Sequence, residues 1–145
     1  AKREGNALAA AVIDVERLKA VNDAHGHDAG DRLLAEFGRL LREHLRRSDL
    51  AFRYGGEEFC VLMPYTPAAA TATKVAELLR RWQHMSFELG TVTLWQVSFS
   101  AGVADSGEAL GTPAALLKAA DERLLLAKRS GRAKVLAAYR AEVPG

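Results

Sequence analysis

This chain of 145 residues has one cysteine, no long apolar run and almost no excess of charge of either sign. The single cysteine, Cys60, excludes an intramolecular disulfide framework. No apolar run approaches the roughly 20 residues that a membrane-spanning helix needs. Lys and Arg number 20 against 18 Asp and Glu, which gives a net charge of +2. A net charge this small gives no strong nonspecific attraction to DNA, so we expect no nucleic-acid partner.

What is present is the composition of an ordinary globular protein, with 49% hydrophobic and 26% charged residues. The length fits a single domain over residues 1–145. The first six residues lead almost directly into an apolar run, so we expect a domain excised from a longer protein; a naturally short protein is the alternative. We expect a cytoplasmic location, and the sequence leaves open whether the parent protein is membrane-anchored.

The first third of the chain predicts one strand and two helices. A nearly continuous apolar run predicts a strand over 8–15 that is covered on both faces. A short helix over 17–23 follows, and Gly26 ends it. Apolar residues at helical spacing then predict a long helix over 29–46 with one buried face.

A glycine pair gives the clearest hairpin signal. Gly55 and Gly56 separate two apolar segments, 50–54 and 59–63, and a tight turn between them requires the positive φ angles that glycine adopts easily. We therefore predict an antiparallel hairpin with both glycines at its tip.

The last half of the chain predicts two more helices and two strands. Thr-Pro pairs at 66–67 and 112–113 each provide an N-cap followed by a first-turn proline, and Gly131 is placed to end the last helix. Residues 91–103 and 133–138 are predicted strands. The order of elements predicts an α/β (α+β) sandwich, with a central, mostly antiparallel sheet wrapped by helices.

Two adjacent carboxylates, Glu57 and Glu58, follow the glycines of the predicted hairpin. Gly55 and Gly56 let a ligand approach the backbone closely, and carboxylate oxygens at such a turn can hold a hard cation. The alternative is a solvent-exposed hairpin tip with ordinary surface charge.

Asp14 lies at the end of the first apolar strand, where a carboxylate is unfavourable unless it is paired or bound to a metal. If this strand lies beside the hairpin, Asp14 and Glu57 share one site, and the two carboxylates repel unless a cation lies between them. Mg²⁺ takes one or two protein carboxylates and completes its octahedron with phosphate oxygens and water. The alternative makes Asp14 the cap of the following helical turn.

The segment 22–31 is polar and interrupted by glycines. Its Asn and Asp side chains offer the donors and acceptors that read the edge of a guanine. His25 and His27 suggest zinc, but no further Cys/His pair has the spacing of zinc ligands, so turn or capping roles are the better interpretation.

Two pairs of charged residues can each be interpreted as a ligand-binding pair or as a common structural feature. Lys128 and Arg132 lie one helical turn apart and can clamp phosphates, or interact with the dipole at a helix C-terminus. Arg46 and Asp49 can grip a guanine and its phosphate, or form an exposed ion pair of little energetic value.

Ordered motifs along nearly the whole chain resemble those of the GGDEF domain, the catalytic domain of bacterial diguanylate cyclases. Residues 55–59 read G-G-E-E-F, and residues 14–23 are similar to D-x-D-x-F-K-x-x-N-D. Residues 26–31 match G-H-x-x-G-D, and residues 98–104 resemble S-x-S-x-G-v-A. Residues 120–133 resemble A-D-x-A-L-Y-x-A-K-x-x-G-R-N.

This resemblance implies a fold akin to nucleotidyl cyclases and polymerase palms. It also implies a reaction in which two GTP molecules condense to cyclic di-GMP with release of pyrophosphate. Each domain would hold one GTP, and a second copy would face it as an antiparallel homodimer. Two Mg²⁺ ions per site are expected, with Mn²⁺ as the alternative ion. An upstream sensory or dimerisation domain is expected in the parent protein.

The resemblance also implies roles for individual residues. Asp14, Glu57 and the Val15 carbonyl would bind the metal, and Glu58 would be a further catalytic residue. Arg46 and Asp49 match an R-x-x-D site at which bound product inhibits the enzyme. The residues implied to bind GTP, through guanine, phosphates or close backbone approach, are Arg17, Leu18, Lys19, Asn22, Asp31, Gly55, Gly56, Lys128 and Arg132.

Several positions depart from the family pattern. Glu16 replaces the usual second Asp, Leu125 replaces a usual Tyr, and Ala133 replaces a usual Asn. The D-x-L-T-x-L-x-N-R-R segment that normally precedes the first strand is absent. These departures favour a second hypothesis, a catalytically weak domain that acts as a cyclic di-GMP receptor through Arg46 and Asp49.

Overall fold

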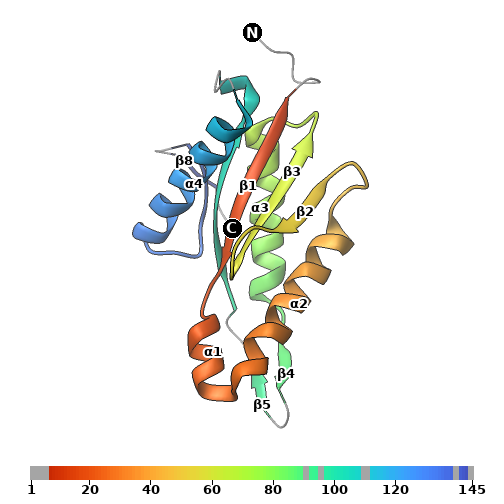
Figure 1. The fold of residues 1–145 in the computed structure, drawn as a ribbon, viewed down its shortest axis with the longest axis vertical. Coiled ribbons are helices and arrows are strands. Elements are labelled where there is room, and N and C mark those ends of the chain that lie inside the picture. The colour runs from red at the N-terminus through yellow and green to blue at the C-terminus, as the bar shows by residue number, and fades with distance from the viewer. Residues whose placement is uncertain (1–6, 90–91, 95–96, 109–111, 139–140, 144–145) are drawn as a thin grey trace.

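The computed structural model describes residues 7–89, 92–94, 97–108, 112–138 and 141–143. The strands of its main sheet are β1 (Leu8–Val15), β2 (Leu50–Arg53), β3 (Glu58–Pro64), β6 (Phe99–Asp105), β7 (Val135–Ala138) and β8 (Ala141–Val143). They lie in the order β2-β3-β1-β6-β7-β8 (Figure 1). Only β6 and β7 pair in parallel, so the predicted α+β class with a mostly antiparallel sheet is confirmed.

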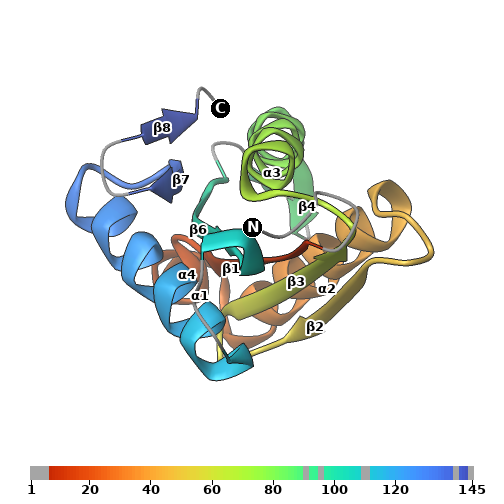
Figure 2. The ribbon, with the colours of Figure 1, turned by 90° about the horizontal axis from the view of Figure 1, so that it is seen from above.

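Helices cover both faces of this sheet. They are α1 (Leu18–His25), α2 (His27–His44), α3 (Ala68–Gln83) and α4 (Pro113–Arg129), with a short 3₁₀ turn at Ser106–Glu108. Ala9, Ala11 and Ile13 of β1 belong to the larger core with α1, α2 and α3, whereas Ala10 and Val12 pack in a smaller core with α4. Figure 2 shows α3 and α4 on opposite sides of the strands. Alternating side chains of one strand therefore serve two cores, which explains its continuous apolar run.

Phe37 fixes α2 against the sheet. Its ring makes edge-to-face contacts with Phe59, Phe99 and Trp82, with centroid separations of 5.1, 5.3 and 5.0 Å. Such aromatic pairs contribute about 0.5–1.5 kcal/mol each beyond the burial of their surface. The cluster joins α2 to β3, β6 and α3, and so holds the start of α2 near the end of β1 (Figure 1).

The first predicted elements have the expected order with small shifts at their ends. The strand over 8–15 matches β1, while the predicted helices over 17–23 and 29–46 are Leu18–His25 and His27–His44. Gly26 has φ 98° and separates α1 from α2, as predicted. The shifts lie at helix ends, where side-chain pattern is least informative.

The hairpin between β2 and β3 is present, but its predicted turn is wrong. Residues 54–57 form a four-residue loop, and neither Gly55 nor Gly56 has a positive φ. The amides of Tyr54 and Gly55 both donate to the carbonyl of Glu58, at 2.7 and 3.2 Å. A longer loop can close with ordinary dihedral angles, so it does not need the strained geometry of a two-residue turn.

The two Thr-Pro pairs behave differently. At α4, Thr112 caps the helix as predicted, because its hydroxyl accepts from the amide of Ala115 at 3.1 Å and Pro113 is the first helical residue. At α3, Pro67 itself is the N-cap and makes no side-chain cap, so the predicted threonine cap is wrong. Thr66 instead donates to the carbonyl of Pro64, and Asp105 accepts from the first helical amide of α3.

The predicted strand over 91–103 is two strands in the described part of the chain. β5 (Val92–Leu94) pairs with β4 (Phe87–Leu89) as a separate hairpin, and β6 belongs to the main sheet. Residues 91, 95 and 96 of that prediction lie outside the described residues. The predicted strand over 133–138 is β7. Among the described residues, no helix combines the length and apolarity that a membrane crossing requires.

Candidate active site

The end of β1 and the start of β3 lie side by side and bring acidic residues together. Antiparallel pairing places Asp14 opposite Glu58, and the amide of Val15 donates to the carbonyl of Glu57 at 3.0 Å. The loop over 54–57 is therefore held against the end of β1. Asp14 and Glu57 line the same two cavities, so residues distant in the sequence meet at one site.

A cation from α4 faces these carboxylates. Lys128 forms an ion pair with Asp14, whose side chain is buried. Asp14 therefore has a charged partner that offsets the cost of burying its carboxylate. The interpretation of Asp14 as a simple helix cap is wrong, because Arg17 is the N-cap of α1 and no side chain caps it.

Burial and neighbouring charge shift the ionisation of the loop carboxylates. Burial raises the pKa of Glu57 above its ordinary value, and the charge of Asp14 raises it further, while Lys128 and Arg132 lower it. Burial and then Asp14 raise the pKa of Glu58 as well. Carboxylates that resist ionising together are stabilised by an additional positive charge between them.

The donor atoms at this point suit a hard cation. Asp14, Glu57 and Val15 all line one cavity, and two carboxylates with a carbonyl oxygen are ligands that Mg²⁺ accepts. Across the described ranges, no three His, Cys, Asp or Glu side chains form a complete metal cluster. An ion held here would therefore take its remaining ligands from phosphate or water.

Two adjoining cavities extend from the acidic residues. The larger, about 670 Å³, is lined by Lys19, Asn22 and Asp31 and by Gly56 and Glu57 of the loop over 54–57. The smaller, about 470 Å³, is lined by Arg17, Lys19, Lys128 and Arg132. The predicted site residues that line at least one cavity are Asp14, Val15, Arg17, Leu18, Lys19, Asn22, Asp31, Gly56, Glu57, Glu58, Lys128 and Arg132. Gly55 lines neither cavity.

The side chain of Asn22 has a fixed orientation at the cavity wall. The amide of Gly30 donates to Asn22 Oδ1 at 2.8 Å, across the break between α1 and α2. A Cβ atom at position 30 would lie 2.7 Å from that oxygen, so the contact requires glycine. With Oδ1 engaged, the NH₂ group of Asn22 is left as the donor toward a ligand.

The turn from β1 into α1 presents backbone amides to the smaller cavity. Arg17 has φ 71°, a left-handed conformation that is uncommon for a residue with a side chain. The first amides of α1 have no partner within the helix and receive no side-chain cap. Strained backbone beside a cavity is typical of functional sites.

Sequence reasoning missed several residues that line these cavities. The larger one also includes Asp23, His27, Gly30, Leu34 and Arg53, and the smaller one includes Glu16, Ser98, Gly131 and Ala133. The match of residues 26–31 to G-H-x-x-G-D is a sequence signal that includes His27 and Gly30, whereas nothing local connects Ser98 to this site. His25 and His27 are in no metal cluster among the described residues.

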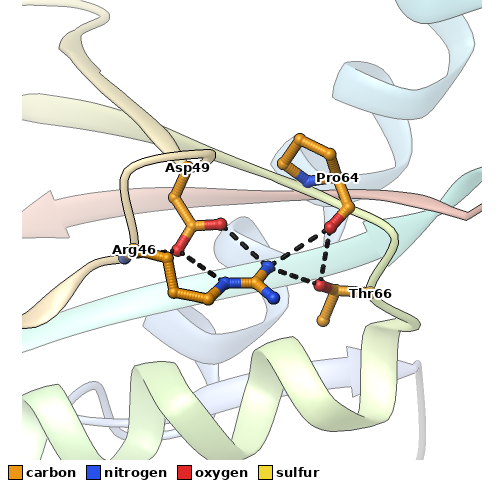
Figure 3. Close-up of polar contacts among 4 residues, drawn as sticks. All are labelled: Arg46, Asp49, Pro64 and Thr66. Atoms are coloured by element: carbon orange, nitrogen blue, oxygen red, sulfur yellow. Dashed lines mark hydrogen bonds and ion pairs between the residues drawn. The ribbon is translucent and has the colours of Figure 1, made fainter.

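Arg46 and Asp49 lie away from these cavities and form a closed network (Figure 3). The guanidinium and main-chain amide of Arg46 both donate to the buried carboxylate of Asp49, at 2.8–3.3 Å. The guanidinium also donates to the hydroxyl of Thr66 at 2.8 Å and the carbonyl of Pro64 at 3.2 Å. The pair is thus more than the exposed ion pair considered above, because the Asp49 side chain is only 1% exposed. It borders a third cavity of about 350 Å³ that Arg42 and Arg47 also line.

The family model described as "Diguanylate cyclase, GGDEF domain" matches residues 1–134. The chain belongs to this family. The GGDEF domain is 43% identical over 136 residues to the response regulator PleD of Caulobacter vibrioides, a match that covers 91% of this chain and 29% of PleD. It is 37% identical over 127 residues to the diguanylate cyclase DgcM of Escherichia coli, covering 88% of this chain and 30% of that protein. The chain therefore spans less than a third of these relatives.

Solved structures of GGDEF domains share this fold. The domain of DgcB from Caulobacter crescentus in complex with c-di-GMP superposes with a TM-score of 0.85 at 26% identity, covering 94% of this chain and 80% of that one. The GGDEF domain of TpbB (YfiN) from Pseudomonas aeruginosa gives a TM-score of 0.83 at 37% identity, covering 92% and 78%. The expected membership of the GGDEF family is confirmed.

Proposed function

We propose that this GGDEF domain condenses two molecules of GTP into cyclic di-GMP and releases pyrophosphate. The observation that supports the proposal is the meeting of Asp14, Glu57 and Lys128 at a cavity that Asn22 and Asp31 also line. Acidic groups for a cation, a basic group for phosphate and polar groups for a base are thus within one space. The names of the relatives support the same activity.

Asn22 and Asp31 would select guanine. The NH₂ group of Asn22 can donate to a guanine acceptor, because its oxygen is engaged by Gly30. The exposed carboxylate of Asp31 can accept from the N1–H and N2–H groups of the same base. Adenine has no such pair of donors on that edge, so the arrangement favours GTP over ATP.

Basic groups around the smaller cavity would bind the triphosphate. Lys19, Lys128 and Arg132 line it from three different elements or turns. The backbone N–H groups of Arg17 and Leu18 lie at the start of α1, and the N-terminus of a helix favours anions. Together these groups would orient the α-phosphate toward the carboxylates of Asp14 and Glu57.

Asp14, Glu57 and the carbonyl of Val15 would hold Mg²⁺, with Mn²⁺ as the alternative ion. Bound ions, two per site, would supply neutralisation of the phosphate charge and activation of the attacking ribose hydroxyl. Glu58 lines the larger cavity beside Asp14 and Glu57, and burial and the charge of Asp14 raise its pKa above the ordinary value, so its carboxylate holds a proton more readily than an exposed one. We therefore assign Glu58 to catalysis rather than to structure.

A second copy of the domain is needed to complete the product. The larger cavity, of about 670 Å³, would hold one GTP. Cyclic di-GMP contains two guanosines, so two domains would face each other as an antiparallel homodimer. We also propose that residues 1–145 form a single domain of a longer cytoplasmic signalling protein, whose upstream part senses a signal or dimerises. The small share of each relative that the chain spans supports this view.

Arg46 and Asp49 would form a product site that restrains the enzyme. The neighbouring cavity and the arginines at 42 and 47 offer positive charge for a phosphate of cyclic di-GMP. Binding there requires the guanidinium of Arg46 to exchange its bonds to Thr66 and Pro64 for bonds to the ligand. The Arg46 guanidinium would then keep its hydrogen-bonding capacity filled, with the product in place of Thr66 and Pro64.

Product analysis tests the activity. Purified protein incubated with GTP and Mg²⁺ is expected to yield cyclic di-GMP by chromatography, and Glu57→Gln is expected to abolish it without loss of the folded state. Glu43→Gln, which removes an exposed ion pair with Arg39, is the matched control and should leave turnover unchanged. If a longer version of the protein that includes its preceding segment also makes no product, the proposal is wrong.

Calorimetric titration with cyclic di-GMP distinguishes a cyclase with product inhibition from the second hypothesis, a catalytically weak cyclic di-GMP receptor. Product inhibition predicts that the wild type binds cyclic di-GMP and that Arg46→Ala does not, while both turn over GTP. Binding through Arg46 with no turnover in any version would instead identify the domain as a cyclic di-GMP receptor.

A further inference from the structure

Glu16 is a buried carboxylate beside the candidate site that none of the roles above uses. Its side chain is 5% exposed and lies at the wall of the smaller cavity. Oε1 accepts from the hydroxyl of Ser98 at 2.7 Å and Oε2 accepts from the hydroxyl of Ser100 at 2.5 Å. The main-chain amide of Glu16 also donates to the carbonyl of Ser98 at 3.0 Å. Glu16 is thus held by Ser100 of β6 and by Ser98, the residue before that strand.

The same carboxylate reaches the turn that follows α4. Glu16 Oε1 accepts from the amide of Ala133 at 3.3 Å, and Oε2 lies 3.7 Å from the guanidinium of Arg132. Contacts from two serines, one amide and one guanidinium satisfy a charge that would otherwise be costly to bury. One side chain therefore joins the end of β1, β6 and the turn over 130–134.

That turn has an unfavourable backbone. Gly131, Arg132 and Ala133 have φ of 114°, 63° and 51°, so two residues with side chains follow glycine in the left-handed region. The amide of Arg132 donates to the carbonyl of Ala127 at 3.0 Å, which holds the start of the turn on α4. The bond from Ala133 to Glu16 holds its other end. Arg132 lies between these two anchors.

We propose that Glu16 is a positioning residue that holds this turn so that Arg132 is directed at the triphosphate in the smaller cavity. The proposal rests on the function proposed above, since it assigns Arg132 to phosphate binding. The direct ion pair is a small part of the effect, because the Arg132 side chain is 57% exposed and the separation is 3.7 Å. The hydrogen bond to Ala133 restricts the backbone, and the backbone aims the guanidinium.

Steady-state kinetics with GTP and Mg²⁺ test this role. Glu16→Met keeps the length of the side chain but removes every acceptor, so we expect KM for GTP to rise about tenfold, equal to the loss of one charge-assisted contact. We expect kcat to change by less than about twofold, because a phosphate contact present before and during reaction acts mainly on binding. Glu16→Gln retains an acceptor for Ala133 and should give an intermediate KM with an unchanged thermal midpoint.

A double-mutant cycle with Arg132→Ala distinguishes positioning from simple loss of stability. If Glu16 acts through Arg132, Glu16→Met should add little to the KM of Arg132→Ala. Ala133→Asn should partly restore the KM of Glu16→Met, because Asn tolerates the left-handed region better than Ala. Arg129→Ala, an exposed charge on the last turn of α4 that lines neither cavity, is the matched control and should not alter KM.

Three results would overturn the proposal. They are an unchanged KM in Glu16→Met, full additivity with Arg132→Ala, and a KM for Glu16→Gln above that of Glu16→Met. If Glu16→Met does not fold, the same double-mutant cycle with Glu16→Gln decides.

Calorimetric binding of GTP with Mg²⁺ separates the test of Glu16 from the test of the proposed cyclase activity. If the wild type binds GTP but neither it nor the longer version of the protein makes product, the cyclase activity alone is refuted, and the cycle is then measured as Kd. A wild type that binds neither GTP nor tripolyphosphate refutes both.

Discussion

Lys128 on α4 donates a hydrogen bond to Asp14 at the end of β1, and the two residues are 114 positions apart in the sequence. The pair connects the smaller core, where α4 packs on β1, directly to the candidate site. The packing of α4 therefore sets the position of a cation beside two carboxylates of raised pKa, Glu57 and Glu58.

Replacement of Lys128 by Met should move metal binding to higher pH. Lys128 lowers the pKa of Glu57 and of Glu58, so its removal leaves burial and Asp14 to raise both pKa values further. A cation binds the ionised carboxylates, and their ionisation then needs a higher pH. We expect the acid side of a Mn²⁺ binding curve, measured by calorimetry across a pH series, to shift upward.

Arg129→Met is the control for this shift, since it removes a neighbouring positive charge that lines neither cavity. An acid side that stays at the wild-type pH in Lys128→Met would show that Lys128 does not control ionisation at the site. KM for GTP should also rise in Lys128→Met, because the same ammonium group is proposed to bind phosphate.

Glu58→Gln should stabilise the free protein at neutral pH while it impairs turnover. Burial, Asp14 and Asp121 raise the pKa of Glu58 in the folded state, so the folded protein binds its proton more tightly than the unfolded chain does. The contribution of Glu58 to the stability of the fold is therefore greatest at low pH. It falls as the pH rises through the interval between the pKa of Glu58 in the unfolded chain and its higher pKa in the folded protein. A neutral amide removes this loss.

Thermal unfolding without divalent cations checks this prediction. The melting temperature of Glu58→Gln should exceed that of the wild type at pH 7, and the difference should shrink toward acid pH. A variant that melts lower than the wild type at pH 7 would show that the Glu58 carboxylate stabilises the fold. Function at the expense of stability is common in active sites.

The parts of this molecule that the sequence predicts well are those with long, regular patterns. β1 has a continuous apolar run and α2 a buried stripe, and both are found within two residues of their expected ends. β4 and β8 have three residues each, too few to show a period, and neither was predicted. The hairpin at Gly55-Gly56 was predicted, but its loop length depends on where pairing stops.

Contacts between distant segments explain what the sequence did not reveal at the site. Thr66 resembles a helix cap locally, yet its hydroxyl accepts from Arg46, twenty positions earlier. Glu16 differs from the family pattern by one methylene group, and only the fold shows that Ser98, Ser100 and Ala133 surround it. The grouping of Asp14 with Glu57 was inferred because strand ends are easier to place than side chains.

Gly30→Ala should weaken GTP binding and leave the fold intact. The new Cβ would lie 2.7 Å from Asn22 Oδ1, so the Asn22 side chain must leave the position in which its NH₂ group faces the cavity. Ala also favours the helix, which offsets strain in α2. We expect KM for GTP to rise about tenfold or more, since a good base contact contributes about 1–3 kcal/mol of discrimination. Discrimination against ATP, measured by competition, should fall in parallel.

Gly38→Ala on the same helix is the control for that substitution. The nearest atom to a Cβ at position 38 is 3.5 Å away, an ordinary contact, so GTP binding should be unaffected. Unchanged affinity and unchanged selectivity in Gly30→Ala would indicate that Asn22 does not read the base.

Gly102→Ala should destabilise the protein severely, through the contact between α4 and β6. A Cβ at position 102 would lie 2.0 Å from the carbonyl oxygen of Ala120 and 2.2 Å from the amide nitrogen of Leu124, both in the helix backbone. Backbone atoms cannot rotate away as a side chain can, so α4 must move off the sheet. Overpacking of this kind costs about 1–3 kcal/mol or more, and we expect the urea midpoint to fall accordingly. Because Lys128 is on that helix, a displaced α4 should also weaken GTP binding in whatever fraction stays folded.

Gly38→Ala is the control, because it should change stability in the opposite direction. Its free energy of unfolding should rise by about 0.5–1 kcal/mol from helix propensity. Equal midpoints for Gly102→Ala and the wild type would mean that α4 does not pack as closely on β6 as these distances require.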